Sequence, residues 1–259
     1  MRDLREASGL PIALNTQKNR LVLGAGLTKV TPAVRYLKEM REVLVSKDTS
    51  SPRELYYMYR GLRKIKDETA IRGNKLRYDV TIIRHERLGP EFMKTAGHYH
   101  PGCFGELYEV LSGEGWCLLQ KKNSRNFRII EDVILVKARA GDKIVIPPYY
   151  GHILINIGKE CLVTSNWVSG EFASEYELYK KSGGAAYFVL EDKLGERFEV
   201  NAYYQSVPRI RVAKPARKIA KFGLKAGEPM YPLLYKDVQK LDFLNNPLKY
   251  DYRDVFVFL

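Results

Sequence analysis

Residues 95–106 read Thr-Ala-Gly-His-Tyr-His-Pro-Gly-Cys-Phe-Gly-Glu, and this stretch decides the fold. It holds two of the four histidines of the chain, His98 and His100, with one residue between them. Successive side chains of a strand point to opposite faces, so both imidazoles of an extended H-x-H pair lie on one side and can bind one metal ion. In a helix the same spacing would turn the two rings about 200° apart. We therefore predict that this stretch is extended and that the two histidines act together.

Further residues continue the pattern at fixed distances. Glu106 follows six positions after His100, and Gly113 follows seven positions after Glu106. An ordinary half-buried histidine would be the favoured interpretation of any one ring, but three of the four histidines fall on two spaced motifs. His85 matches neither motif, and we interpret it as a surface or strand-edge residue. The second motif consists of Gly141, Pro147, His152 and Asn156.

The two motifs resemble the paired motifs of the cupin superfamily, roughly H-x-H and E-x6-G followed by G-x5-P-x4-H-x3-N. The resemblance implies a mainly β fold, the cupin double-stranded β-helix or jelly-roll barrel, in which these side chains converge on one divalent metal ion. The sequence departs from the pattern in two places. Five residues separate His100 from Glu106 instead of three or four, and Tyr149 stands where many cupins carry glycine. The implied metal ligands are His98, His100, Glu106 and His152.

Glu109 is the nearest rival of Glu106 as the acidic ligand. On a strand Glu109 would face the side opposite to Glu106, so we prefer Glu106. Imidazole and carboxylate ligands together suit transition-metal ions better than Ca²⁺, which prefers oxygen ligands. We expect one divalent ion per subunit, with Fe²⁺ as the first choice and Zn²⁺, Mn²⁺, Ni²⁺ and Co²⁺ as alternatives.

Short β-branched segments separated by turn residues begin near Tyr78 and predict an antiparallel barrel or sandwich. Upstream, Thr31-Pro32 and the helical spacing of the following apolar residues predict a helix to about Val45. The segment Leu55–Tyr59 fits a short helix or a strand equally well. The predicted strands cover residues 79–83, 107–111, 116–120, 127–130, 133–136, 143–146, 153–157, 162–168, 187–191 and 197–200, with a turn at 192–195.

These patterns divide the chain into three parts of one structural domain. Residues 1–75 are predicted to form an N-terminal helical arm that packs on the barrel. Residues 76–200 form the cupin β-barrel. Residues 201–259 are a basic, proline-rich C-terminal extension that wraps the barrel or packs against a second subunit.

The 259 residues carry 43 Lys and Arg against 30 Asp and Glu, a formal net charge of +13 that is densest from Arg209 to Lys225. Such an excess fits a nucleic-acid surface, an anionic small substrate or a Lys-rich exterior. The basic run contains one aromatic residue, Phe222, which is poor support for stacking of single-stranded bases. The three cysteines are dispersed, and neither a membrane-spanning apolar run nor a secretory signal is present. We expect a soluble, cytoplasmic protein.

A narrower resemblance covers about residues 52 to 190. Several segments look like the cupin-type glucose-6-phosphate isomerases of archaea. This implies a metal-dependent aldose–ketose isomerase that interconverts glucose 6-phosphate and fructose 6-phosphate through a cis-enediolate, with Glu106 as the catalytic base and a homodimer as the assembly. The segments that carry the resemblance are 95–101, 105–115, 118–120, 147–152 with 156–158, and 55–60.

The resemblance also implies substrate contacts. The chain has no Gly-x-x-x-x-Gly-Lys loop, so hydroxyls, backbone N–H groups and cations must hold a phosphate. Shorter family members carry a histidine some twenty residues after the last ligand, whereas the stretch 169–176 has none. Ring opening would then fall to Ser174, Glu175, Tyr176 or solvent. The implied phosphate contacts are Thr81, Thr95 and Gly97, and the implied sugar contacts are Tyr108 and Tyr56.

Two other classes of function stay open at this point. The same ligand set would serve a mannose-6-phosphate isomerase or an Fe²⁺-dependent dioxygenase, although hydroxyl-bearing residues favour a polyol phosphate over an apolar substrate. A non-enzymatic sugar- or nucleic-acid-binding cupin ranks last, because no helix-turn-helix pattern accompanies the predicted barrel.

Overall fold

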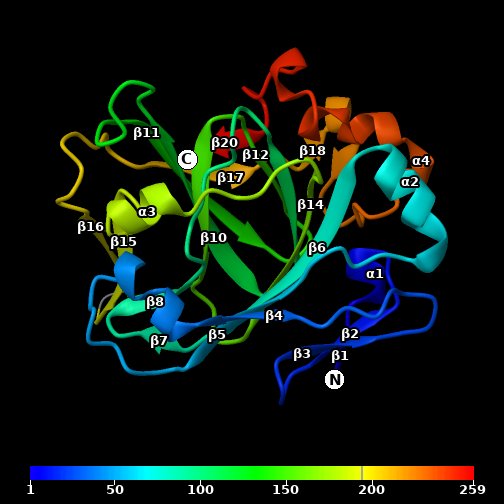
Figure 1. Cartoon of the computed structure of the whole chain (residues 1–259), viewed down its shortest axis with the longest axis horizontal. Helices are drawn as coiled ribbons and strands as arrows, with labels where there is room; N and C mark the ends of the chain where they lie inside the picture. The colour runs from blue at the N-terminus through cyan, green and yellow to red at the C-terminus, as the bar shows by residue number, and fades with distance from the viewer. Residues whose placement is uncertain (194) are drawn as a thin grey trace.

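The computed structural model describes residues 1–193 and 195–259 and consists mainly of strands (Figure 1). One sheet has the order β12-β9-β14-β6-β5-β4, and the other has the order β16-β15-β8-β13-β10-β11-β17-β20, with β7 beside β8. The strands common to the barrel are β6 (Leu76–Ile83), β8 (Glu91–Lys94), β9 (Glu106–Ser112), β10 (Glu114–Lys122), β11 (Ile130–Arg139), β12 (Lys143–Ile146), β13 (Tyr150–Asn156) and β14 (Leu162–Ser169).

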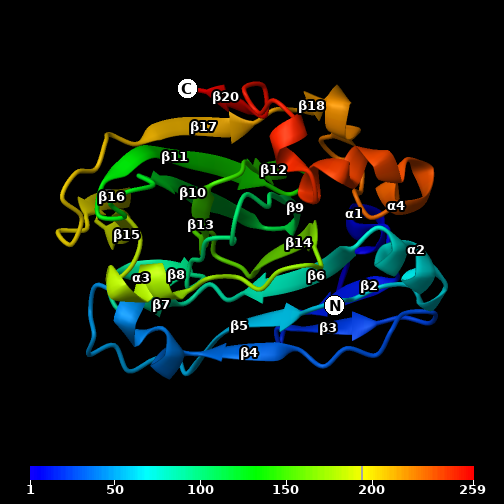
Figure 2. The same ribbon diagram turned by 45° about the horizontal axis from the view of Figure 1, so that its top comes forward.

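The chain passes repeatedly from one sheet to the other. β9 and β10, β11 and β12, and β13 and β14 are consecutive strands that lie in different sheets. Figure 2 shows the two sheets as stacked layers, with β10 and β11 above β6 and β5. This double winding of antiparallel strands is the jelly-roll arrangement, so the prediction of a mainly β, cupin-type barrel is confirmed. Its interior is lined by alternate residues of strands such as β9 and β14, which are buried along their whole lengths.

The predicted helix from Thr31 to Val45 is wrong. The segment contains strand β4 (Ala33–Tyr36), which pairs with β5 (Glu54–Tyr59), and then two 3-10 turns, η1 (Leu37–Glu39) and η2 (Arg41–Val43). The helical spacing of its apolar residues was therefore overridden by pairing at the sheet edge. The undecided segment Leu55–Tyr59 is a strand.

The remaining N-terminal elements are short. β1 (Arg2–Asp3), β2 (Ile12–Asn15) and β3 (Arg20–Leu23) form a three-stranded sheet, so strands supply much of the arm that was expected to be helical. The helical turns are α1 (Arg5–Ser8), η3 (Ile65–Asp67) and α2 (Glu68–Gly73).

Most of the other predicted strands are present with shifted ends, but 127–130 is wrong as a strand. Phe127 and Arg128 lie in a turn, and β11 begins only at Ile130. The pair β15 (Tyr187–Asp192) and β16 (Gly195–Val200) is present, and the turn predicted between them includes Leu194, which lies outside the described residues. The smaller elements around them are β7 (Arg87–Leu88) and α3 (Glu177–Lys181).

The C-terminal extension wraps the barrel. β17 (Arg211–Pro215) pairs in parallel with β11, and β20 (Phe256–Phe258) pairs with β17 at the sheet edge. Over the other sheet, Tyr231 packs on Trp167 and Tyr78, with ring centroids 5.5 and 4.9 Å away. The remaining elements are β18 (Lys218–Ile219), η4 (Ala220–Phe222), β19 (Leu224–Lys225), α4 (Leu233–Lys236), η5 (Val238–Leu244) and η6 (Pro247–Lys249). None of the described helices combines the length and the apolar character needed to span a bilayer.

Candidate metal centre

The structure brings the four predicted ligands together inside the barrel. His98 and His100 follow β8 in an extended segment, and the backbone of His98 exchanges two hydrogen bonds with that of His152 on β13. Glu106 is the first residue of β9 on the facing sheet. One ligand atom from each residue can be chosen so that all four lie within 4.8 Å of one another.

A single carboxylate oxygen lies at the centre of this group. Glu106 Oε2 is 3.2 Å from the Nε2 atoms of His100 and His152 and 3.9 Å from Nε2 of His98. The other oxygen, Oε1, accepts a hydrogen bond of 2.6 Å from the side-chain amide of Asn166 on β14. Asn166 therefore fixes the rotation of the carboxyl group so that Oε2 faces the three rings.

The protonation of His100 follows from its second contact. His100 Nδ1 lies 2.9 Å from the backbone carbonyl of Phe104, which can only accept, so Nδ1 carries the proton. In the neutral ring Nε2 then presents a lone pair toward Glu106 Oε2. The 3.2 Å between Nε2 and Oε2 is bridged by a proton when the ring is charged and by a metal ion when the ring is neutral, and a carbonyl behind the ring is the usual outer partner of a metal-binding histidine.

The pKa shifts of these residues also favour the binding of a metal ion. Burial lowers the pKa of His98 well below its ordinary value, and the neighbouring rings of His152 and His100 lower it further. Burial also lowers the pKa of His152. Burial opposes ionisation of Glu106, but the imidazoles of His100 and His152 outweigh it and hold the pKa of this carboxyl well below its usual range. Neutral imidazoles and an ionised carboxylate are the forms that bind a metal ion, so these residues fit a divalent cation.

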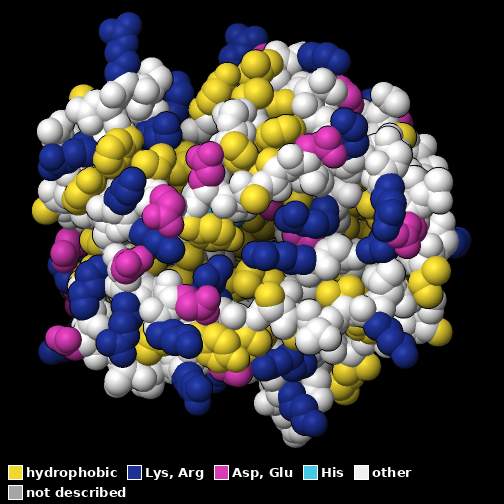
Figure 3. Space-filling view, in the orientation of Figure 1, with side chains coloured by type: hydrophobic (Ala, Val, Ile, Leu, Met, Phe, Trp, Pro, Cys, Tyr) yellow, Lys and Arg dark blue, Asp and Glu magenta, His cyan; other side chains and the backbone are white. Residues whose placement is uncertain are grey.

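A polar cavity of about 70 Å³ opens beside the centre. In Figure 3 the middle of the face is hollowed, with Lys or Arg side chains beside Asp or Glu side chains at the hollow. His98 and Glu106 line this cavity. All five residues predicted to bind substrate line it too, namely Thr81, Thr95, Gly97, Tyr108 and Tyr56.

Each of these five has a definite local role. The Tyr56 hydroxyl accepts hydrogen bonds of 3.2 Å from Arg35 Nε and from the backbone N–H of Ala96, so its own proton is available to a ligand. Gly97 has φ of +78°, and a Cβ there would lie 2.5 Å from a methyl group of Ile153, which explains the glycine. Thr95 Oγ1 accepts a hydrogen bond of 3.0 Å from the backbone N–H of Leu154, and the Tyr108 hydroxyl lies 3.2 Å from His152 Nε2. Thr81 on β6 is the register partner of Thr164 on β14.

The stretch expected to replace the missing histidine is only partly in the cavity. Ser174 and Tyr176 line it, and the Tyr176 ring is 5.5 Å from that of His98. Glu175 lines the neighbouring groove instead, and its backbone pairs with Tyr99. Four polar residues of the cavity were not predicted from the sequence: Arg60, Arg77, Asp79 and Asn166. The alternation of side chains along β5, β6 and β14 was the signal that could have indicated them.

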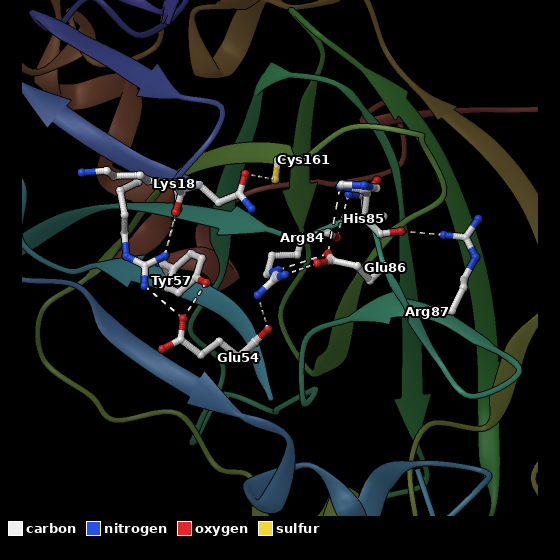
Figure 4. Close-up of polar contacts among 11 residues, drawn as sticks. Lys18, Glu54, Tyr57, Arg84, His85, Glu86, Arg87 and Cys161 are labelled. Atoms are coloured by element: carbon white, nitrogen blue, oxygen red, sulfur yellow. Dashed lines mark hydrogen bonds and ion pairs between the residues drawn. The ribbon is translucent and has the colours of Figure 1, made fainter. Parts of the chain in front are cut away.

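His85 and Glu109 lie away from the centre, as predicted. Figure 4 shows His85 in the loop after β6, beside Glu86 and Arg87, with its side chain 47% exposed. Arg87 donates a hydrogen bond of 2.8 Å to the backbone carbonyl of His85. Glu109 is paired with Lys143 on the outer side of the sheet, at 2.8 Å.

Comparison with known proteins identifies the family. Residues 34–206 match the family model described as glucose-6-phosphate isomerase (GPI). The chain belongs to the glucose-6-phosphate isomerase family. Among the curated relatives, it is 27% identical over 113 residues to the glucose-6-phosphate isomerase of Thermococcus gammatolerans, covering 43% of this chain and 56% of that protein. It is 31% identical over 86 residues to that of Pyrococcus furiosus, covering 33% and 42%.

The match to these glucose-6-phosphate isomerases is partial: the chain spans about half the length of the curated relatives it matches. Among solved structures, it is similar to an oxalate decarboxylase of Bacillus subtilis with a TM-score of 0.34 and 20% identity, covering 48% of this chain and 28% of that chain. That score is too low to add to what the strand pairing itself shows about the fold.

Proposed function

We propose that the protein is a metal-dependent isomerase that interconverts glucose 6-phosphate and fructose 6-phosphate. One observation carries this proposal: a buried carboxylate, Glu106, faces three imidazoles at the wall of a polar cavity. Membership of the glucose-6-phosphate isomerase family supports the same substrate class.

His98, His100, Glu106 and His152 would hold one divalent ion. Such an ion, when bound, supplies Lewis-acid stabilisation of the negative charge that develops on the two reacting oxygens of the sugar. We propose Fe²⁺ as the first choice, with Zn²⁺, Mn²⁺, Ni²⁺ and Co²⁺ as alternatives, because all accept this combination of imidazole and carboxylate ligands.

Glu106 is proposed as the base of the reaction. Its carboxylate takes the C2 proton of the open-chain aldose, the C2–H electron pair forms the C1–C2 double bond, and the C1 carbonyl pair moves to O1 to give the cis-enediolate. The proton then returns to C1 as the C2 carbonyl forms, and the hydroxyl proton passes from O2 to O1 to complete the ketose. Asn166 binds Oε1 at 2.6 Å, which leaves Oε2 as the oxygen that carries the proton. The carboxylate also serves as a ligand, so the proposal requires that Glu106 be held loosely enough to act as a base.

The rest of the cavity is proposed to bind the substrate. Thr81, Thr95 and Gly97 would contact the phosphate, and Tyr108 and Tyr56 the sugar. Ser174 and Tyr176 are the groups of the missing-histidine stretch that lie near enough to assist ring opening. We further propose a cytoplasmic homodimer in which residues 76–200 form the catalytic barrel.

A coupled assay tests this proposal. Fructose 6-phosphate turnover should require a divalent ion, stop after EDTA treatment and return when the ion is restored. Activity that is indifferent to chelation and to Glu106→Gln would contradict the proposal. Mannose 6-phosphate turnover and oxygen uptake by the iron-loaded protein, measured in parallel, separate this isomerase from the two other cupin activities.

A further inference from the structure

The residues proposed to contact the phosphate are all uncharged. Thr81 and Thr95 offer hydroxyls, and Gly97 offers only its backbone. A phosphate that leaves water for a cavity loses a large hydration energy, which neutral donors replace less well than cationic ones. Among the described residues that line the cavity, the permanently cationic side chains are Arg60 and Arg77. These two arginines are therefore the cationic groups of the cavity that could neutralise a phosphate.

Arg77 is held rigidly at the cavity wall. Its Nε donates to both carboxylate oxygens of Asp79, at 3.1 and 3.0 Å. Asp79 is 5% exposed and also accepts a hydrogen bond of 2.8 Å from the backbone N–H of Gly61. Because the ion pair uses Nε, the two Nη groups at the other edge of the guanidinium are available to a ligand. Two parallel N–H donors match the oxygens of a phosphate.

The sheet register places Arg77 on the same wall as Glu106. Arg77 on β6 pairs with Val168 on β14, and Val168 pairs with Glu106 on β9. Directly paired residues share a face, and two strand spacings separate the two backbones by about 10 Å. That distance suits a hexose phosphate that has its reacting carbons at Glu106 and its phosphate beside the guanidinium. Arg60 lines the same cavity as Arg77 and Glu106.

We infer that Arg77, positioned by Asp79 and assisted by Arg60, supplies the positive charge that binds the phosphate of the substrate. The threonine hydroxyls and the backbone of Gly97 complete the phosphate site with neutral hydrogen bonds. This inference rests on the proposed function, since it takes the substrate to be a sugar phosphate. Asp79 is a positioning residue, which acts through Arg77.

A binding measurement tests the inference independently of turnover. The probes are 6-phosphogluconate and gluconate, which differ only in the phosphate, titrated by calorimetry into the full-length, metal-loaded protein. The parent should bind 6-phosphogluconate much more tightly than gluconate. The double variant Arg77→Gln/Asp79→Asn, which avoids leaving Asp79 buried without its cation, should reduce that affinity ratio at least about tenfold. Its affinity for gluconate should stay within about twofold of the parent.

Further variants make the test independent of folding. Arg60→Gln changes an exposed side chain and should lower the ratio by a smaller factor, and Arg77→Lys should give an intermediate loss because it keeps the charge without the fork. The matched control is Arg211→Gln/Asp132→Asn, which removes a comparable Arg–Asp pair outside the cavity, with contacts of 2.9 and 2.5 Å. This control should leave the ratio unchanged.

Two results would overturn the inference: an unchanged ratio in the Arg77 and Arg60 variants, or equal losses of affinity for both probes. If the parent fails to isomerise fructose 6-phosphate but shows an Arg77-dependent ratio, the phosphate site stands and the proposed reaction fails. If it isomerises with an Arg77-independent ratio, the reaction stands and the site fails. In steady-state kinetics Asp79→Asn should raise KM for fructose 6-phosphate more than it lowers kcat.

Discussion

Two buried glutamates three positions apart on β9 have opposite surroundings. Glu106 points into the barrel, where its Oε2 faces three imidazoles. Glu109 points to the outer side of the sheet, where it pairs with Lys143 at 2.8 Å and accepts the backbone N–H of Met230 at 3.1 Å. A buried carboxylate needs a cation or hydrogen-bond donors. The chain supplies a lysine as the cation of Glu109, whereas three imidazole rings surround Glu106, and this difference separates a structural acid from a candidate metal ligand.

The acid strengths of the two groups differ in the same way. Burial raises the pKa of Glu109 to about 7, against the opposing pull of Lys143 and the Met230 N–H. The pKa of Glu106 is held well below its usual range by His100 and His152, despite burial. The two side chains therefore provide matched positions for substitution, equal in residue type, strand and burial.

The largest expected effect is on the reaction. Glu106→Gln should lower kcat for fructose 6-phosphate by about 10²–10⁴-fold, because it removes the proposed base and an ionic ligand. Glu109→Gln should leave kcat per folded molecule within about twofold of the parent. Steady-state assays of both variants, with the folded fraction measured by circular dichroism, check this. Equal losses of kcat in Glu106→Gln and Glu109→Gln would contradict the claim that only Glu106 takes part in the reaction.

The next effect is on stability, and here the surroundings of Glu109 matter more than those of Glu106. Lys143→Met leaves the Glu109 carboxylate buried without its cation and should lower the free energy of unfolding by about 3–5 kcal/mol. The double variant Glu109→Gln/Lys143→Met removes both charges and should recover most of this loss. Urea unfolding of the single and double variants measures the coupling. A single variant as stable as the parent would show that the pair is not buried in solution.

The third effect is a pH dependence with a definite sign. Glu109 has a folded-state pKa of about 7, above its ordinary 4.5, so between these values the folded protein holds a proton that the unfolded chain has released. Raising the pH removes that proton, so the contribution of Glu109 to stability falls as the pH rises from about 4.5 to about 7. Unfolding free energies measured across this window should decline more steeply in the parent than in Glu109→Gln/Lys143→Met. Parallel curves would contradict the raised pKa.

The smallest effect concerns ion pairs on the surface. Arg87 and Glu191 form a two-pronged pair with both contacts at 2.8 Å, but their side chains are 28% and 50% exposed. Arg87→Ala should therefore cost no more than about 1 kcal/mol of unfolding free energy, and less at high salt. A loss as large as that of Lys143→Met would show that burial is not what distinguishes these pairs.

Local periodicity predicted the antiparallel strands, whereas the cupin barrel and the four ligands were predicted from the resemblance of two spaced motifs to the cupin superfamily. Alternation placed His98 with His100 and separated Glu106 from Glu109, and turn residues marked most of the strands. The helix predicted from Thr31 to Val45 failed because the same apolar residues serve equally well at the edge of a sheet, and pairing of Ala33 with Met58 decides between the two.

The charged wall of the cavity could not be predicted in the same way. Arg77 and Asp79 are two residues apart on one strand, so a shared face was foreseeable from alternation. Which face lines the cavity depends on the register of β6 against β14 and on the position of β5, which are long-range properties. The wrapping of the C-terminal extension likewise depends on distant contacts, such as the indole N–H of Trp167 to the Met230 carbonyl at 3.3 Å.

Metal content is the most direct test of the account. The full-length protein would be loaded with Fe²⁺ or Co²⁺, freed of excess ion and subjected to elemental analysis, alongside His100→Ala/His152→Ala and Glu109→Gln. We expect about one ion per chain in the parent and in Glu109→Gln, and less than about a tenth of an ion in the double-histidine variant. A parent that retains no ion, or a double-histidine variant that retains as much as the parent, would contradict the claim that these side chains bind one divalent cation.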